Sequence, residues 1–149
     1  MSEHKATIEW KRETLDFGYQ TYNRDHDWSF DGGLRVRASA APAYLGNESR
    51  VDPEEAFVAS LSSCHMLTFL AIAARKKMVV DRYVDQAVGI LDKDAEGRLA
   101  IVRVTLRPEV VFSGEKSPST EEVQLLHEQA HHACFIANSV KTEVVIEPS

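Results

Sequence analysis

The feature that most constrains the fold of this chain is an apolar run from Ala56 to Ala74, in which His65 is the one strongly ionisable side chain. Residues 52–55 (Asp-Pro-Glu-Glu) precede the run, and this order suits an N-cap, a first-turn proline and acidic groups at the positive end of a helix. Residues 75–77 (Arg-Lys-Lys) follow it, where cations suit the negative end. The run therefore predicts one long central helix, buried on most of its faces.

The predicted helix is long enough to cross a membrane. Several polar side chains interrupt its apolar surface, and an acidic cap stands at its start in place of an interfacial anchor. We therefore interpret it as the core helix of a soluble protein and expect no membrane partner.

Composition places the chain among ordinary globular proteins, because 44% of its 149 residues are hydrophobic and 27% are charged. We see no linker or internal repeat and predict a single domain over residues 1–149. The net charge of −6 argues against nucleic acid as a partner, since phosphate binding needs concentrated positive charge. The first residues lack the apolar stretch of a secretory signal, so we expect a cytoplasmic protein.

Alternating patterns predict strands on both sides of the long helix, and a capping box predicts a second helix. Ser119 and Glu122 form this box, and the apolar stripe that follows continues to Cys134. The strands are expected at residues 6–10, 34–37, 84–90, 99–106 and 142–146. This order predicts an α+β fold, with helices packed against antiparallel sheets.

The only two cysteines, Cys64 and Cys134, exclude a disulfide scaffold and a tetrathiolate zinc site. Cys64 lies in the middle of the apolar helix and is either a small packed side chain or a nucleophile. A nucleophile needs a group that lowers its pKa. His65 is a poor choice, because adjacent helical residues do not face each other, and an arginine from elsewhere would serve better.

Glu54 is the obvious carboxylate to hold such an arginine. It lies ten residues before Cys64, which in a continuous helix is about 15 Å and a different face. Either the helix breaks between the two residues, or Glu54 acts across a dimer interface.

Residues 127–131 (His-Glu-Gln-Ala-His) match the HExxH zinc-protease motif. The extended motif fails, because Cys134 and Ala137 stand where a glycine and a third histidine are expected. A zinc protease is therefore disfavoured. A simpler metal site remains an alternative, with ligands from His127, His131, His132 and Cys134, joined by Cys64 and His65.

The segment Asp52-Pro53-Glu54-Glu55-Ala56-Phe57, followed by Ser62-Ser63-Cys64, resembles the OsmC/Ohr superfamily of osmotically inducible and organic hydroperoxide resistance proteins. A second cysteine seventy residues later, between a helix and a final strand, fits the same pattern. The resemblance extends from about residue 30 to the end of the chain.

This resemblance implies an OsmC-like fold, with antiparallel sheets around a central helix, and an intertwined homodimer with active sites at the subunit interface. It implies an antioxidant thiol peroxidase of the stress response that needs no cofactor or metal. Cys64 would be the peroxidatic thiol and Cys134 the resolving thiol. Glu54 would pair with an activating arginine. Arg24 lies at the expected distance upstream, although the N-terminal region offers five candidates: Arg12, Arg24, Arg35, Arg37 and Arg50.

In the implied reaction, Cys64 reduces an organic hydroperoxide or hydrogen peroxide and becomes a sulfenic acid, which Cys134 converts to a disulfide. An external dithiol, for which a lipoyl group is one candidate, then reduces the bridge. We expect apolar walls around the substrate from Phe57, Met66, Leu67 and Phe69. The alternative is a non-catalytic OsmC-like stress or binding protein, whose cysteines and histidines are structural or hold a metal.

Overall fold

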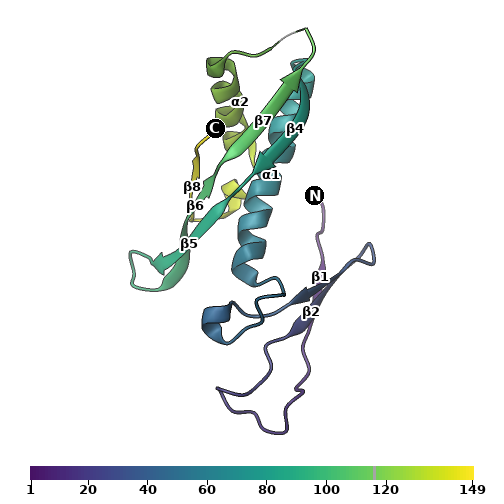
Figure 1. The fold of residues 1–149 in the computed structure, drawn as a ribbon, viewed down its shortest axis with the longest axis vertical. Helices are drawn as coiled ribbons and strands as arrows, with labels where there is room; N and C mark the ends of the chain where they lie inside the picture. Colours follow the sequence, from purple (N-terminus) through teal and green to yellow (C-terminus); the bar gives the residue numbers. More distant parts are fainter. Residues whose placement is uncertain (116) are drawn as a thin grey trace. The chain divides into compact units, whose positions relative to one another are not determined.

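The computed structural model describes residues 1–115 and 117–149, and the chain divides into two compact units, residues 1–56 and 57–149. The first unit is an antiparallel meander in the order β1-β2-β3 (Figure 1). Its strands are β1 (Ala6–Glu9), β2 (His26–Phe30) and β3 (Arg35–Ala38). The predicted strands 6–10 and 34–37 correspond to β1 and β3, whereas β2 was not predicted, although its residues (His-Asp-Trp-Ser-Phe) alternate in polarity.

The loop from β3 to the long helix is held by close backbone packing. Its 3₁₀ turn is η1 (Pro42–Tyr44). The backbone N–H of Asn47 donates to the buried hydroxyl of Ser39 at 3.1 Å. A Cβ on Gly46 would lie 1.6 Å from the carbonyl oxygen of Ala40, so this position requires glycine. The loop therefore has one defined conformation where it leads into the start of the long helix.

The long helix α1 (Pro53–Arg75) starts where the sequence predicts. The side chain of Asp52 accepts from Glu55 N at 2.8 Å, and the Glu55 carboxylate accepts from Asp52 N at 3.2 Å, which forms a reciprocal cap. Length and composition alone would allow α1 to cross a membrane.

The prediction that α1 is buried on most faces is wrong for the single chain. Its buried residues recur every fourth position and form one stripe: Leu61, His65, Phe69 and Ala73. On another face Leu67 is 60% exposed. The reason is that unit 2 supplies packing partners to one side of α1, which leaves an apolar face open.

The second unit contains two small sheets. In the first, β4 (Val79–Asp85) pairs antiparallel with β7 (Pro108–Ser113). In the second, the order is β5-β6-β8, and its strands are β5 (Val88–Lys93), β6 (Leu99–Leu106) and β8 (Glu143–Ile146). The strand expected over 84–90 is instead two strands, because the chain leaves one sheet at Asp85 and enters the other at Val88.

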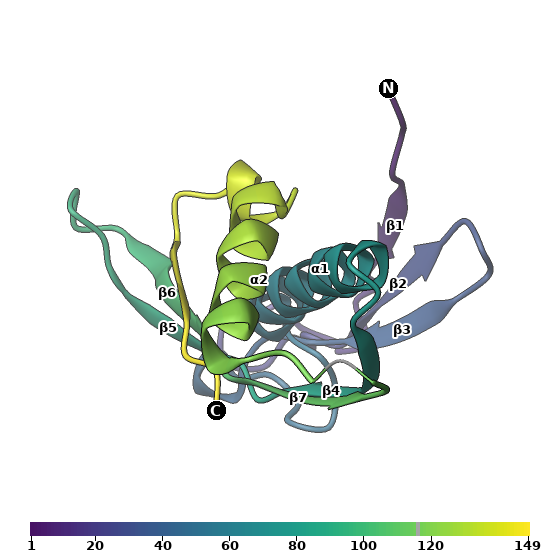
Figure 2. The ribbon, with the colours of Figure 1, turned by 90° about the horizontal axis from the view of Figure 1, so that it is seen from above.

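The predicted α+β fold with helices against antiparallel sheets is confirmed, although β8 joins β6 in parallel. Helix α2 (Thr120–Ala133) begins with the predicted capping box, and the short turn η2 (Ala137–Ser139) follows it. Figure 2 shows α2 beside α1, with β4 and β7 across one side of the pair. The helices meet through a buried cluster: Phe69, Ala73, Leu126 and Ala130.

Candidate active site

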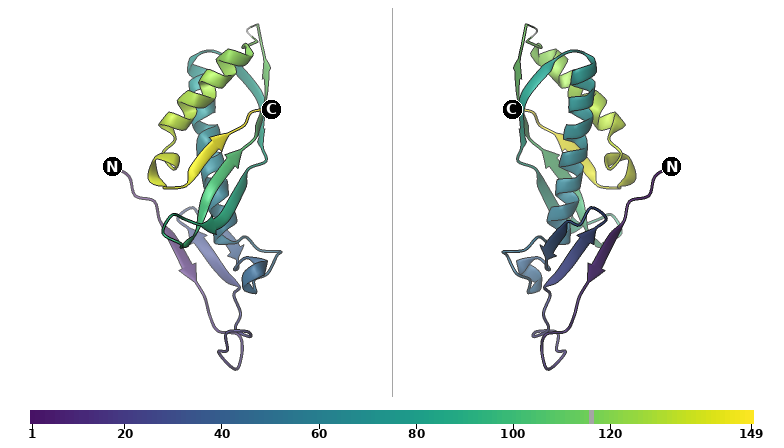
Figure 3. Two further views of the ribbon diagram at one scale, coloured as in Figure 1. Left: turned by 90° about the vertical axis from the view of Figure 1, so that its left-hand side faces the viewer. Right: turned by 90° about the vertical axis from the view of Figure 1, so that its right-hand side faces the viewer.

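Both cysteines belong to the second unit and are free thiols. Cys64 lies midway along α1 and is partly buried, whereas Cys134 is the C-cap of α2 and is 1% exposed. Leu126 and Ala130 belong to the apolar stripe that the sequence predicted on α2, and both are buried. Cys134 continues this stripe and is therefore buried as well. The cysteines are thus presented by two packed helices, which Figure 3 shows from two sides.

The thiols of Cys64 and Cys134 are neighbours. Burial raises the pKa of the Cys134 thiol, the N–H of Ala137 at 3.5 Å from its Sγ partly offsets this, and the adjacent Cys64 thiol raises it further. Cys134 therefore favours its protonated form. The structure thus brings together the two cysteines that the resemblance pairs.

A cavity of about 640 Å³ lies against Cys64. Leu67, Thr68 and Ala71 of α1 line the cavity, and so does Phe135, which directly follows Cys134 and is 80% exposed. Cys64 is therefore open to a small substrate, whereas Cys134 is covered.

The apolar walls predicted from the sequence are only partly correct. Leu67 lines the Cys64 cavity, but Phe69 is fully buried in the core and Phe57 lines a separate cavity. The difference follows from the helical period, which directs Phe69 to the buried stripe. Phe135 was missed, and its position beside Cys134 was the available signal.

Two buried histidines connect the helices behind the cysteines. The Nε2 of His65 and the Nδ1 of His127 are 3.0 Å apart, and the rings are parallel within 5° with centroids 5.3 Å apart. A centroid distance this long with so short an N···N contact means that the rings lie edge to edge in nearly one plane. One nitrogen donates to the other along that plane.

Burial lowers the pKa of both rings to about 4. The charges of His127 and His131 lower the value for His65 further, whereas Asp85 opposes the shift at His127. Both imidazoles are consequently neutral at pH 7.

The metal alternative gains no support from this geometry. Within residues 1–115 and 117–149, no group of three or more His, Cys, Asp or Glu side chains is placed to hold a metal ion. His127 uses its Nδ1 in the bond to His65, so the HExxH motif is part of the packing between α1 and α2.

Arg24 lies in the first unit, just before β2. Its guanidinium donates to the carbonyl oxygens of Tyr22 and Tyr19, each at 2.5 Å, and sits 3.6 Å from the centroid of the Tyr22 ring. It lines a cavity of about 420 Å³ with Trp10 and with Pro53, the residue before Glu54. Arg24 is therefore held near the start of α1 within this unit.

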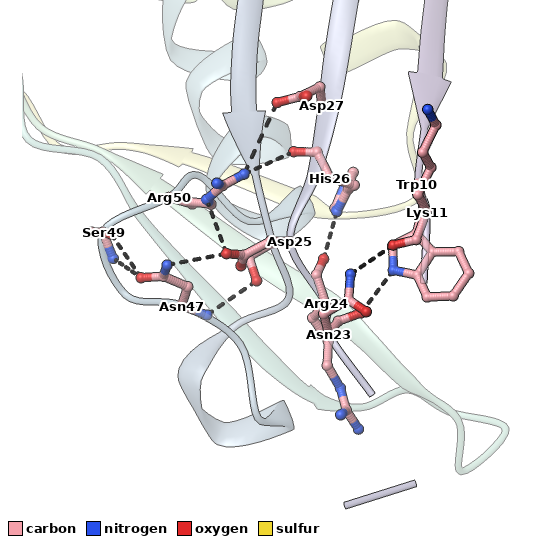
Figure 4. Close-up of polar contacts among 11 residues, drawn as sticks. Trp10, Lys11, Asn23, Arg24, Asp25, His26, Asp27, Asn47, Ser49 and Arg50 are labelled. Atoms are coloured by element: carbon pink, nitrogen blue, oxygen red, sulfur yellow. Dashed lines mark hydrogen bonds and ion pairs between the residues drawn. The ribbon is translucent and has the colours of Figure 1, made fainter. Parts of the chain in front are cut away.

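The backbone around Arg24 is fixed by side-chain hydrogen bonds (Figure 4). The Asn23 amide donates to Lys11 O at 2.8 Å, and the indole of Trp10 donates to Asn23 O at 2.7 Å. His26 Nε2 accepts from the Trp28 indole at 3.0 Å, so the ring carries its hydrogen on Nδ1, which donates to Arg24 O at 2.8 Å. These contacts hold Asn23 against the segment directly after β1, and they hold Arg24 against the start of β2.

The other candidate arginines also lie in the first unit. Arg50 pairs with Asp25 at 3.3 Å and approaches Asp27 at 4.0 Å, as Figure 4 shows. Arg35 pairs with Asp27, Arg12 donates to two backbone carbonyls, and Arg37 lies on β3. Among the five, Arg24 is the one found in the cavity that includes Pro53.

Helix α1 is unbroken from Pro53 to Arg75, which excludes the first possibility for Glu54, a break in the helix before Cys64. Glu54 and Cys64 stand ten residues apart on one continuous helix, about 15 Å along its axis. The helix does not break between them, so the two side chains of one chain do not meet.

Comparisons with known proteins agree on the fold. A family model described as OsmC-like protein matches residues 46–149. An OsmC-like protein of unknown function from Vibrio cholerae is 51% identical over 100% of both chains, with a TM-score of 0.97. A search of curated protein sequences gives no match.

More distant structures share the fold at low identity. An organic hydroperoxide resistance protein from Elizabethkingia anophelis is 19% identical over 99% of this chain and 94% of its own, with a TM-score of 0.74. The organic hydroperoxide resistance protein OhrB of Bacillus subtilis is 21% identical over 99% and 98%, with a TM-score of 0.71. Together with the family match and the close structural relative, these findings show that the chain belongs to the OsmC-like protein family.

Proposed function

We propose that this protein is a thiol peroxidase that reduces organic hydroperoxides or hydrogen peroxide. The observation that carries the proposal is the pair of neighbouring free thiols, one open to a cavity and the other covered. Family membership supports it, because relatives with this fold are named organic hydroperoxide resistance proteins.

In the proposed reaction, the Cys64 thiolate attacks one peroxide oxygen and the O–O bond breaks. The other oxygen leaves as an alcohol or water after taking a proton, and Cys64 becomes a sulfenic acid. Cys134 then attacks the Cys64 sulfur, water leaves, and a disulfide forms. The raised pKa of Cys134 suits this second role, because a thiol kept protonated competes poorly for the peroxide.

We also propose that the active protein is a homodimer in which Glu54 and Arg24 of one chain complete the site at Cys64 of the other. The arginine would stabilise the thiolate, and Glu54 would orient the arginine. The unbroken helix supports this arrangement, because it separates Glu54 from Cys64 within one chain. The open apolar face of α1, with Leu67 60% exposed, supports a second copy as its cover.

A cytoplasmic location and an external dithiol reductant complete the proposal. Reduced compartments keep such thiols free between turnovers. The reductant must present two thiols, because exchange with the Cys64–Cys134 disulfide passes through a mixed disulfide that a second thiol resolves. A lipoyl group has this chemistry.

One equivalent of cumene hydroperoxide added to the reduced protein is expected to form an intramolecular Cys64–Cys134 disulfide and consume both free thiols. Peptide mapping by mass spectrometry under non-reducing conditions measures this product. In the Cys134→Ser variant the same treatment should leave a Cys64 sulfenic acid that dimedone traps. Recovery of both thiols unmodified after complete peroxide loss would refute the proposed pathway.

Mixed dimers test whether Glu54 acts across the interface. Each of the variants Cys64→Ser and Glu54→Gln should be strongly impaired alone. After they are mixed and allowed to exchange subunits, one site per heterodimer would contain both native residues, so activity should rise toward about a quarter of wild type, since heterodimers form about half of the mixture. A mixture as inactive as its components, with heterodimers detected by native mass spectrometry, would show that both residues must belong to one chain.

A further inference from the structure

A second cavity lies in unit 2, between α2 and β7, and shares no lining residue with the Cys64 cavity. Its volume is about 640 Å³, within the usual range for small-molecule sites. The wall is slightly more apolar than polar, and its apolar side chains come from β7, α2 and β8: Pro108, Val110, Phe112, Val123 and Ile146. The peroxidase chemistry proposed above does not use this cavity.

The polar part of the wall includes two imidazoles one helical turn apart, His127 and His131, and four exposed polar residues: Thr120, Gln124, Glu128 and Ser149. His127 is 2% exposed, and its Nδ1 is occupied by His65 of α1. Because the two rings are nearly coplanar, Nε2 of His127 lies on the ring edge that faces away from His65. That nitrogen has no hydrogen-bond partner among the described residues, and neither does the buried Nδ1 of His131. A buried polar atom of this kind normally has a partner.

The charges around the cavity limit the charge that a bound molecule can carry. His127 is neutral at pH 7, because burial lowers its pKa to about 4, so it offers a hydrogen bond and no positive charge. Glu128 lines the same cavity and is exposed, and the chain as a whole carries a net charge of −6. An anionic head group would be repelled there.

We propose that this cavity binds a small uncharged molecule, with an aliphatic body against the β7 wall and a hydroxyl or carbonyl head at the imidazole edge of His127. The proposal does not depend on the peroxidase assignment. It also supplies a hydrogen-bond partner for the buried Nε2 of His127.

Three probes with one alkyl chain and different heads test the proposal: 1-octanol, octanoate and octylammonium. The full-length protein is titrated at pH 7 while the side-chain ¹⁵N resonances of its histidines are recorded by NMR. 1-Octanol should shift the His127 Nε2 resonance saturably, and octanoate should bind at least tenfold more weakly. Equal or tighter binding of octanoate or octylammonium would overturn the uncharged class, and no saturable shift with any probe would overturn the site.

Matched tryptophan variants on α2 locate the binding. Val123→Trp fills the cavity and should weaken 1-octanol binding at least tenfold, whereas Leu125→Trp, on the exposed side of the same helix, should leave it unchanged. Thr120→Trp at the exposed cavity wall provides a second blocking variant should Val123→Trp fail to fold. Unchanged affinity in the folded blocking variant would overturn the proposal, as would probe shifts confined to residues of the Cys64 cavity.

Discussion

Replacing Cys64 by serine is expected to reduce peroxide consumption to the uncatalysed background, a loss on the order of a thousandfold or more. A serine hydroxyl stays protonated at pH 7 and cannot supply the nucleophilic electron pair that the Cys64 thiolate provides. Peroxide loss followed in the presence of a dithiol reductant measures the effect. Because Cys64 is partly buried and nearly isosteric with serine, the variant should keep its fold.

Ala59→Ser is the matched control, because Ala59 is exposed on α1 and does not line the Cys64 cavity. This variant should retain activity within about twofold of wild type. Full activity in Cys64→Ser would eliminate the peroxidase assignment and leave the alternative of a non-catalytic OsmC-like protein. Loss of turnover in Cys64→Ser alone, with an unchanged circular dichroism spectrum, would support the assigned role of the thiol.

Acidification from pH 6.5 to pH 4 is expected to destabilise the protein through the His65–His127 pair. The folded state holds both rings neutral with a pKa of about 4, whereas the unfolded chain takes up protons near the ordinary imidazole pKa of 6.5. Between these values the unfolded state binds more protons, so the free energy of unfolding falls as the pH falls. The loss for the first ring amounts to roughly 3 kcal/mol, and these rings contribute no pH dependence above about pH 7.

Urea unfolding at pH 7 and pH 5 measures the part of this loss that develops above pH 5. The variant with both His65→Leu and His127→Leu should show a smaller difference between the two pH values, because only groups outside the pair then titrate. His132→Leu, at an exposed position, should behave as wild type. An unchanged pH difference in the double variant would show that the pair does not control acid stability.

Single substitutions in the pair should cost more than the double substitution at pH 7. His127→Leu leaves the Nε2 of His65 buried without its partner, and an unpaired buried polar group costs about 1–3 kcal/mol. Two leucines remove both polar groups together and continue the apolar contact with Phe69. Urea unfolding of the single and double variants at pH 7 therefore tests whether the two histidines act as a packed, neutral pair.

Several parts of this structure could be predicted from local sequence, because short-range physics decides them. The cap at Asp52 and the box at Ser119 act within four residues, so both helices begin where predicted. The strands β2 and β7 were missed. The residues of β2 do alternate in polarity, so a signal was present, whereas in β7 consecutive Val and Phe side chains hide the alternating burial. The predicted strand over 84–90 was wrong for a related reason, since the boundary between two sheets depends on long-range pairing.

The sequence by itself determined the two helices, the α+β class and the presence of one thiol on each helix. Only the tertiary structure decided that the thiols of Cys64 and Cys134 are neighbours, because that contact depends on how two helices pack across seventy residues of chain. Tertiary packing also placed one histidine of the HExxH motif in a buried imidazole pair, since His127 faces His65 of α1. It left one apolar face of α1 open, because a single chain has too few partners to cover every side of a helix that is apolar all round.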